Sequence, residues 1–501
     1  MRYVKIQPAK EAFYEQYRQG GMVTVSAEVS MDMDTPVSIY YKLVGEEKGF
    51  ILESATINQQ FGRFSFIGME PLATVCVYKD KLVVSEDDGV LEIKGSPVEA
   101  LKAYTKKFQS AEMDAALPLL KGGLVGFFNY EVVATFDRIR GLDITADQVL
   151  GEFMISRIMI VVDHFKNTAK IVHLMPANTH ESVDAAYAEA VGKIQSVYEK
   201  LQQPVQRKTK NEERHLPALD FKHLHEDVPK EFLAMIRKGK EYITAGDAFQ
   251  IVLSRPFQCE ITQPGFLFYR RLRQVNPSAY MFYLNFGEKK LVGASPEMLV
   301  KISGDQVFTY PIAGSRRRGK TPEEDLALAQ ELLQDEKECA EHAMLVDLSR
   351  NDVGRISDPG TVRVEKMMQV EKFSHIMHIV SEVSGKIRQG YEALDVLKAC
   401  FPAGTLSGAP KLRAMEIIQE LEGSSRNAYA GTVGYIDFNG NMDMCITIRT
   451  MQIQGTTAVV QAGAGIVADS VATTEYKEIL QKAGALFQVI EEVENGDFAD
   501  R

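Results

Sequence analysis

The sequence of 501 residues contains no tryptophan and only five cysteines. The cysteine count is odd, the spacing is wide, and no pair reads C-x-x-C. This pattern argues against a disulfide framework and a cysteine zinc site, and it favours a reducing compartment. The missing tryptophan excludes no class of function. The cysteines are Cys76, Cys259, Cys339, Cys400 and Cys445.

Long apolar runs are also missing. No stretch approaches the roughly 18 consecutive apolar residues that a transmembrane helix needs, so we expect no membrane span and no membrane partner. Residues 1–17 show neither an apolar run nor a small-residue cleavage site. The absence of both signals predicts a cytoplasmic protein.

The chain has no excess of basic residues, because its formal net charge is −11. Phosphate backbones need a basic face, so nucleic acid is not expected as the main partner. Neither G-x-G-x-x-G nor G-x-x-x-x-G-K-[ST] occurs, so nucleotide binding has no support. A few arginines and a cation could still form a local positive pocket for an anionic metabolite.

The length of the chain suits two α/β-type domains or one unusually large one. The composition changes at residues 202–217, which are rich in charge, contain two prolines and have almost no apolar side chains. A linker is the expected explanation, although a surface loop would look similar. We therefore predict an N-terminal α+β domain over residues 1–201, a linker over 202–225, a second domain over 226–493 and a tail over 494–501.

Local patterns predict several elements. Short apolar runs predict strands, paired runs around turns predict hairpins, and apolar residues at helical spacing predict helices. The strands are expected at residues 37–44, 50–53 and 64–67, the hairpins at 74–78 with 82–85 and at 159–163 with 170–174, and the helices at 182–201 and 226–245.

Two expected helices each carry a pair of glutamates three residues apart. The first starts with a Thr-Pro-Glu-Glu capping sequence at Thr321 and continues without a break past Glu338 and Glu341, which share a face. The second carries Glu475 and Glu478. Together they could bring four carboxylates to one hard cation, and all-oxygen ligation suits Mg²⁺. For any single pair, a solvated helix face is the commoner explanation.

Three glycine-containing segments could bind an anion. Residues 401–411 (FPAGTLSGAPK) lead into an expected helix over 412–421, whose first N–H groups are unpaired. Residues 461–465 (QAGAG) and 311–319 (PIAGSRRRG) each lie between a strand and a helix. Glycine usually marks only a turn, so each segment is a weak signal by itself.

An arginine and two histidines could also take part in chemistry. A hairpin is expected from residues 435–438 and 442–451, with Arg449 opposite the apolar face of its second strand. Such an arginine is usually exposed, and the alternative is a bidentate carboxylate clamp. His375 and His378 would point to opposite faces of a strand and cannot chelate one metal. Each is a structural histidine by default, and one could be a catalytic acid or base.

Six segments, taken in order, resemble the chorismate-binding enzymes. This family includes anthranilate synthase component I, aminodeoxychorismate synthase component I, and the isochorismate and salicylate synthases. The resemblance is close over residues 226–493 and looser before them. It implies an α+β fold with a large antiparallel β-sheet sandwich core and peripheral helices, with 226–493 as the catalytic domain. The segments are ASPE at residues 294–297, PIAGSRRRG, DEKECAEHAMLVDLSRND, the segment around His378, GTLSGAPK and QAGAGIVADS.

The resemblance also implies roles for single residues. Glu341 and Glu478 would bind Mg²⁺ directly, with Glu338 and Glu475 supporting them through water, and the cation would hold the ring carboxylate of chorismate. Three catalytic residues are implied: Glu297 as the general acid for the C4 hydroxyl, His378 as the proton-transfer group for pyruvate loss, and Thr405. The implied substrate contacts are Arg449, Tyr429, Gly463, Ala464 and Gly465 at the enolpyruvyl carboxylate, and Gly314 and Ser315 elsewhere.

Two positions distinguish the members of the family. Aminodeoxychorismate synthases carry a nucleophilic lysine where this chain has Ala313, and isochorismate-type enzymes carry a basic lysine where it has Gln250. Both replacements imply that ammonia attacks C2 directly, giving anthranilate and pyruvate, the first step of tryptophan biosynthesis. The chain has no G-x-C-x-G elbow, so a separate glutamine amidotransferase subunit is implied as the ammonia source.

A regulatory site is implied as well. Residues 52–54 and 276–281 resemble segments that bind feedback tryptophan, with Ser54, Ala279, Tyr280 and Met281 as the expected contacts. This chain departs from the usual pattern at Ala279, where proline is common.

The alternatives are an aminodeoxychorismate or isochorismate synthase, a chorismate-binding homologue without catalysis, and a simple metal-binding module.

Overall fold

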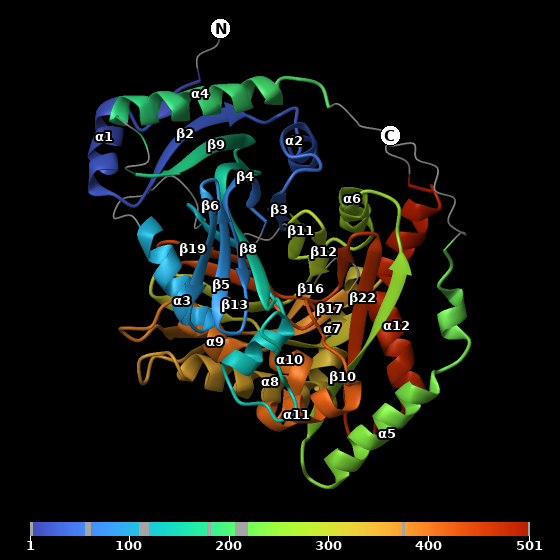
Figure 1. Ribbon diagram of the computed structural model, residues 1–501. Helices are drawn as coiled ribbons and strands as arrows, with labels where there is room; N and C mark the ends of the chain where they lie inside the picture. Colours follow the sequence, from blue (N-terminus) through green and yellow to red (C-terminus); the bar gives the residue numbers. More distant parts are fainter. Residues whose placement is uncertain are drawn as a thin grey trace.

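The computed structural model describes residues 4–55, 62–109, 120–177, 180, 182–205, 219–372 and 376–498. His375, residues 206–218 of the expected linker and residues 499–501 of the expected tail lie outside this part. Within it, 22 strands join through antiparallel pairs into one network that folds into two layers (Figure 1).

Two long strands connect the layers. Strands β4 (Phe64–Val77) and β8 (Gly151–Asp163) pair along their whole length. The first half of β4 also pairs with β3 (Gly49–Glu53), and its second half pairs with β5 (Lys81–Glu86). The register between β4 and β8 shifts once, at Pro71, and such a bulge bends a strand. Each long strand therefore takes part in both layers.

The other strands extend these layers on either side. The first layer has the order β1 (Ile6–Gln7), β2 (Met22–Ser30), β9 (Thr168–Pro176), β8, β4, β3, β11 (Tyr280–Asn285), β12 (Lys289–Ser295), β21 (Thr450–Gln454), β22 (Thr457–Ile466), β10 (Gln250–Glu260) and β18 (Gly408–Ala409). The second has the order β6 (Gly89–Lys94), β5, β4, β8, β7 (Gly123–Phe128), β19 (Thr432–Asp437), β20 (Met442–Ile446), β13 (Met298–Ser303), β14 (Gln306–Thr309) and β17 (Ile376–Lys386), with β15 (Ile312–Arg317) and β16 (Arg363–Lys372) also paired to β17.

Side chains alternate between two hydrophobic clusters, as the pleat of a strand requires. In β11, Phe282 and Leu284 join one cluster, whereas Met281 and Tyr283 join the other. The first cluster lies between the layers and beneath the helices of the second layer. The other lies between the outer face of the first layer and its helices.

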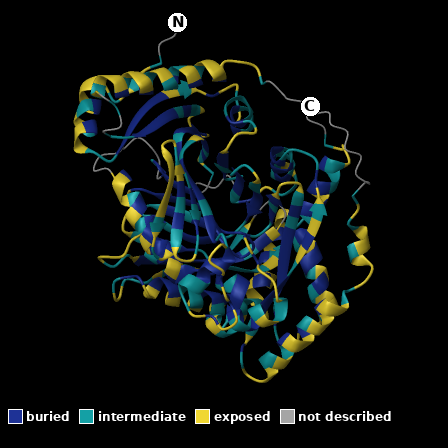
Figure 2. Cartoon of the chain, in the orientation of Figure 1, coloured by how far each residue is buried: buried dark blue, intermediate teal, exposed yellow. Residues whose placement is uncertain are grey.

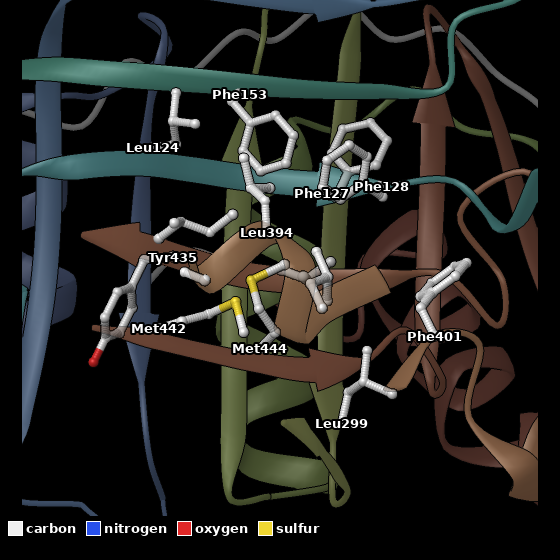
Figure 3. Packing of buried hydrophobic residues seen from close by; sticks show 14 of the residues in the cluster. Leu124, Phe127, Phe128, Phe153, Leu299, Leu394, Phe401, Tyr435, Met442 and Met444 are labelled. Carbon is white, nitrogen blue, oxygen red and sulfur yellow. The ribbon is translucent and has the colours of Figure 1, made fainter. Parts of the chain in front are cut away.

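Aromatic rings hold the two layers together. Phe66 of β4 lies 6.0 Å from Tyr435 of β19, measured between ring centroids. Phe127 of β7 lies 5.8 Å from Phe286, which follows β11. Figure 3 shows another part of the first cluster, where Phe127, Phe128 and Phe153 lie above Leu394 of α9 and Met442 and Met444 of β20.

Helices surround the sheets, and their outward faces are exposed (Figure 2). Among the described residues, no helix is both long and apolar enough to cross a membrane. The first layer is covered by α1 (Lys10–Gln19), α2 (Pro36–Leu43), α4 (Val183–Leu201), α5 (Lys230–Thr244), α6 (Gly265–Val275), α11 (Lys411–Glu422) and α12 (Ala472–Glu494). The others are α3 (Pro97–Thr105), α7 (Pro322–Gln334), α8 (Glu336–Gly354), α9 (Ala393–Cys400), α10 (Gly404–Ser407) and the 3₁₀ turns Lys106–Phe108, Tyr130–Thr135 and Lys222–His225.

This architecture confirms the predicted α+β class with an antiparallel core and peripheral helices. The hairpins predicted at 74–78 with 82–85 and at 159–163 with 170–174 form, and the helices predicted at 182–201 and 226–245 correspond to α4 and α5.

Three local predictions were wrong. The strand expected at 37–44 is the helix α2, because Thr35 and Ser38 form a capping box and Pro36 fits the first helical position. The single helix expected after Thr321 is two, because Asp335 ends α7 and caps α8 through the N–H groups of Lys337 and Glu338, both at 3.1 Å.

The third error concerns the hairpin of residues 435–438 and 442–451. Its second strand, β20, ends at Ile446, so Arg449 does not lie on it. The turn that follows carries the chain from the second layer back to the first.

The predicted domains share both layers. Strand β3 pairs with β11, and β7 pairs with β19, across the expected boundary. The division at residues 201 and 226 stays a prediction.

Candidate active site

The candidate site lies where the chain twice crosses between the layers. Strand β12 ends in the first layer and β13 begins in the second, with Glu297 between them; β20 ends in the second layer and β21 begins in the first, with Arg449 between them. The Ile446 N–H donates to the Glu297 carbonyl at 3.0 Å, and the Ala294 N–H donates to the Arg449 carbonyl at 3.1 Å. The two crossing segments are therefore joined by backbone hydrogen bonds.

Arg449 has a backbone φ of 50°, which is uncommon for a residue other than glycine. Strain of this kind persists only where the surroundings impose it. The guanidinium is half-buried, and burial lowers its pKa, whereas the charges of Glu478 and Glu297 act against that shift. The arginine therefore lies inside the site, and the exposed alternative does not apply.

Glu297 is suited to act as an acid near neutral pH. Burial raises its pKa from 4.5 to about 7, against the opposing effects of the Thr405 hydroxyl and of the charges on Lys482 and Arg449. Thr405 Oγ1 donates to Glu297 Oε1 at 2.9 Å. A large part of the carboxyl population is therefore protonated at neutral pH.

The glycine segment 461–465 lies within β22, and not between a strand and a helix as expected. Strand β21 pairs with β22 only as far as Val460, whereas β10 continues to Ile466. Among the described strands, the residues from Gln461 onward therefore have a partner on one edge only. A Cβ atom on Gly463 would lie 2.6 Å from the hydroxyl of Tyr429, so only glycine fits against this buried tyrosine.

The two glutamate pairs converge from α8 and α12. Burial raises the pKa of Glu341, and the charges of Glu338 and Glu478 raise it further. Burial likewise raises the pKa of Glu475, and Glu478 adds to the effect. All four side chains are half-buried. These carboxylates are thus within electrostatic range of one another and are not two separate solvated faces.

In the arrangement seen, cationic side chains already contact this cluster. Lys482 Nζ lies 2.5 Å from Glu478 Oε1 and donates to the Gly463 carbonyl at 3.0 Å. Arg316 Nη1 lies 3.5 Å from Glu338 Oε1. As the described side chains stand, no group of three or more His, Cys, Asp or Glu residues could hold a metal ion. Carboxylates are the kind of ligand that Mg²⁺ prefers, and these side chains would have to rotate to hold the ion together.

Lys482 was missed by sequence reasoning. It follows Glu478 by four residues on one helix, and this spacing was the available signal. Its ammonium group lies between the carboxylate cluster and β22, and its charge also acts on Glu297.

His378 lies on β17 beside the glycine segment 311–319. Its Nδ1 is 2.9 Å from the Gly314 carbonyl, so the neutral ring carries its proton on Nδ1 and Nε2 is the basic nitrogen. Burial lowers the pKa of His378, so the neutral form prevails at pH 7. Gly314 has a φ of +67°, and a Cβ there would lie 3.1 Å from Glu338 Oε2. Ser315 pairs with His378 and is exposed.

The expected tryptophan segments also meet. The Ala55 N–H donates to the Ser278 carbonyl at 2.9 Å, which places Ser54 and Ala279 near each other, and Met281 pairs with Glu53. The hydroxyl of Tyr280 donates to Asp443 at 2.9 Å, so this side chain points into the protein. Binding of tryptophan here stays a prediction.

Comparisons with known proteins agree with this geometry. A family model described as chorismate binding enzyme matches residues 50–488. Anthranilate synthase component 1 of Acetivibrio thermocellus is 43% identical over 479 residues, covering 94% of this chain and 96% of the relative.

Two solved structures are also similar. The crystal structure of anthranilate synthase component I from Streptococcus pneumoniae has a TM-score of 0.73 and 37% identity, covering 92% of this chain and 99% of that one. The menaquinone-specific isochorismate synthase of Escherichia coli has a TM-score of 0.68 over 96% of this chain and 99% of that one. Its identity is 17%, so this likeness concerns the fold alone.

Proposed function

Because the chain belongs to the chorismate-binding enzymes, we propose that it is the large subunit of an anthranilate synthase, which converts chorismate and ammonia to anthranilate and pyruvate. The observation that carries this proposal is Glu297, a carboxyl group with a pKa of about 7 at the crossing point shared with Arg449. Hydroxide is a poor leaving group, and such an acid can protonate it. Ala313 and Gln250 support ammonia as the nucleophile, because neither can act as a nucleophile or base.

Substrate binding would rest on local positive charge in an acidic protein. Chorismate is a dianion, and Arg449 with the hydroxyl of Tyr429 would hold its enolpyruvyl carboxylate. The one-sided edge of β22 offers N–H groups from alternate residues of 463–465 beside them, since the N–H groups between these point to β10. Lys482 would contribute a second positive charge near the ring.

In the first step, the lone pair of ammonia forms the C2–N bond, both ring double bonds shift by one position, and the C4–O bond breaks. Glu297 gives its proton to the departing oxygen, which leaves as water, and one proton of the new ammonium group returns to Glu297. The product is aminodeoxyisochorismate. Thr405 orients the acid through its hydrogen bond.

In the second step, neutral His378 takes the proton from C2. The ring C–O bond to the enolpyruvyl group breaks, the ring becomes aromatic, and the released enolate takes the proton back from His378 at its methylene carbon to give pyruvate. The Gly314 carbonyl fixes the tautomer that this step needs.

We also propose that the enzyme needs Mg²⁺, held by Glu341 and Glu478 with Glu338 and Glu475 behind them. When bound, the cation would neutralise the ring carboxylate of the substrate. The gathering of four half-buried carboxylates supports this, because like charges repel unless a cation balances them. In the arrangement seen, Gly314 leaves room for the Glu338 carboxylate.

The name component 1 of the relatives supports a second subunit, which we propose to be a glutamine amidotransferase. We further propose a cytoplasmic location and feedback inhibition by tryptophan at the segments around Ser54 and Tyr280.

The test is anthranilate fluorescence with chorismate, MgCl₂ and ammonium chloride, with and without tryptophan. We expect anthranilate to form without a partner subunit, to stop with EDTA, and to decrease with tryptophan. Accumulation of a non-aromatic amine without pyruvate, or of isochorismate, would contradict the proposal.

A further inference from the structure

A small cavity adjoins the candidate site. Its volume is about 160 Å³, and it lies between α8, α10 and β18. Helices α8 and α10 contact each other (Figure 1). The lining is carbon-rich, and its single polar side chain is an amide. The lining residues are Gln250, Met344, Leu345, Leu348, Gly404, Gly408 and Ala409.

Gln250 belongs to the cavity and to the candidate site at once. Its side chain hydrogen-bonds the carboxylate of Glu341. A Cβ atom on Gly465 would lie only 2.5 Å from Gln250 Nε2, so the amide rests against the β22 edge. The amide therefore lies between the cavity and the Glu341 carboxylate of the candidate site.

Two glycines keep the cavity open. A Cβ atom at Gly404 would lie 1.9 Å from Leu348 Cδ2. Gly408 has a φ of +140°, and a Cβ there would lie 2.1 Å from the Gln250 carbonyl oxygen. The sequence led us to expect these glycines to free N–H groups for an anion, whereas here Gly404 makes space beside Leu348 of α8 and Gly408 allows close approach to the backbone of β10.

The chemistry of the lining selects what can pass. Apolar walls penalise ions and strongly hydrated groups, because a lost hydration shell is not replaced. They exclude ammonium and the chorismate dianion, and they admit a small neutral amine. We infer that this cavity is the entrance by which unprotonated ammonia reaches the site. The side-chain carbonyl of Gln250 accepts a hydrogen bond from the ammonia. This inference rests on the proposed function.

The test fills the cavity. In Leu348→Trp, the indole occupies the space between α8 and Gly404, so we expect KM for ammonia to rise about tenfold while KM for chorismate stays within about twofold. The assay is anthranilate fluorescence at saturating chorismate with varied ammonium chloride. Leu333→Trp on α7 is the matched control, since Leu333 is exposed and lies outside the cavity. It should leave both constants unchanged.

A folded Leu348→Trp protein with an unchanged KM for ammonia would overturn the inference. A parallel rise in KM for chorismate would also overturn it, since the cavity would then be the mouth for the ring substrate. Met344→Trp repeats the test from the preceding turn of α8, in case Leu348→Trp does not fold. If the wild type makes no anthranilate from ammonium chloride, the proposed function fails as well. If the wild type makes anthranilate from ammonium chloride and the folded cavity variants keep its KM for ammonia, the proposed function stands and only the assignment of the entrance is wrong.

Discussion

Glu297 shows how one environment sets one residue's chemistry. Its backbone is fixed by the crossing between layers, its carboxyl group is desolvated, and the Thr405 hydroxyl and the charges of Lys482 and Arg449 oppose the resulting rise in pKa. The motif around it pointed to an acid, but only the structure supplies the cause of the raised pKa.

The pH dependence follows from these shifts. Protonated Glu297 is the active form, so kcat should fall as pH rises through about 7. The Thr405 hydroxyl lowers the pKa of Glu297, so Thr405→Val should move this alkaline limb to higher pH. Thr244→Val, at the exposed end of α5, should leave the profile as it is. An alkaline limb that stays in place or moves to lower pH in Thr405→Val would refute the assignment.

His378 separates the two steps of the reaction. Its lowered pKa keeps the ring neutral through the working range, as a base requires. In His378→Ala, amination should continue while pyruvate loss slows, because only the second step uses the ring. Chromatography should then detect aminodeoxyisochorismate. Anthranilate formed at the normal rate would show that this role is wrong.

At this scale the family resemblance supplied the proposed roles of Glu297, His378 and Arg449, and these roles stay predictions. Sequence reasoning placed Arg449 on a strand, because alternation along the sequence cannot reveal where a chain leaves one sheet for another. It missed Lys482 because a lysine one turn after a glutamate is an ordinary helix-surface pattern.

At the scale of elements, two helices bring the four glutamates together. Helix α8 carries Glu338 and Glu341, and α12 carries Glu475 and Glu478. The capping box at Thr321 was recognised, but the break at Asp335 was not. Because of this break, α8 begins at Glu336. Glu338 therefore lies in its first turn, and the Glu338 N–H donates to the Asp335 carboxylate. The glutamate spacing was readable from sequence, whereas the meeting of the two helices depends on the sheets between them.

The glutamate cluster can be tested by titration. Glu478→Gln removes one charge from the set, so Mg²⁺ should bind at least about tenfold more weakly in calorimetry with chorismate present. Glu323→Gln on α7 is the control, since that glutamate is exposed. Equal affinity in both variants would place the metal elsewhere.

At the scale of the whole molecule, the two layers unite residues that the sequence separates. Strands from the first 201 residues pair with strands of the second part in both layers. The composition change near residue 202 marked a boundary in the chain, but long-range pairing is not visible in composition. The antiparallel class was predictable through the family resemblance.

Shared layers predict cooperative unfolding. Phe127 is 1% exposed and contacts Phe286 across the layers, so Phe127→Ala should cost about 3–5 kcal/mol. Urea unfolding followed by circular dichroism should show one transition that shifts as a whole. Two transitions, with only one affected, would instead support independent domains.

The most direct test of the central claim is the balance of products. With chorismate, Mg²⁺ and ammonium chloride as the only reactants, the isolated chain should release anthranilate and pyruvate in equal amounts, and Glu297→Gln should release neither. Pyruvate formed without anthranilate, or an aminated or hydrated ring that keeps its enolpyruvyl group, would contradict the account.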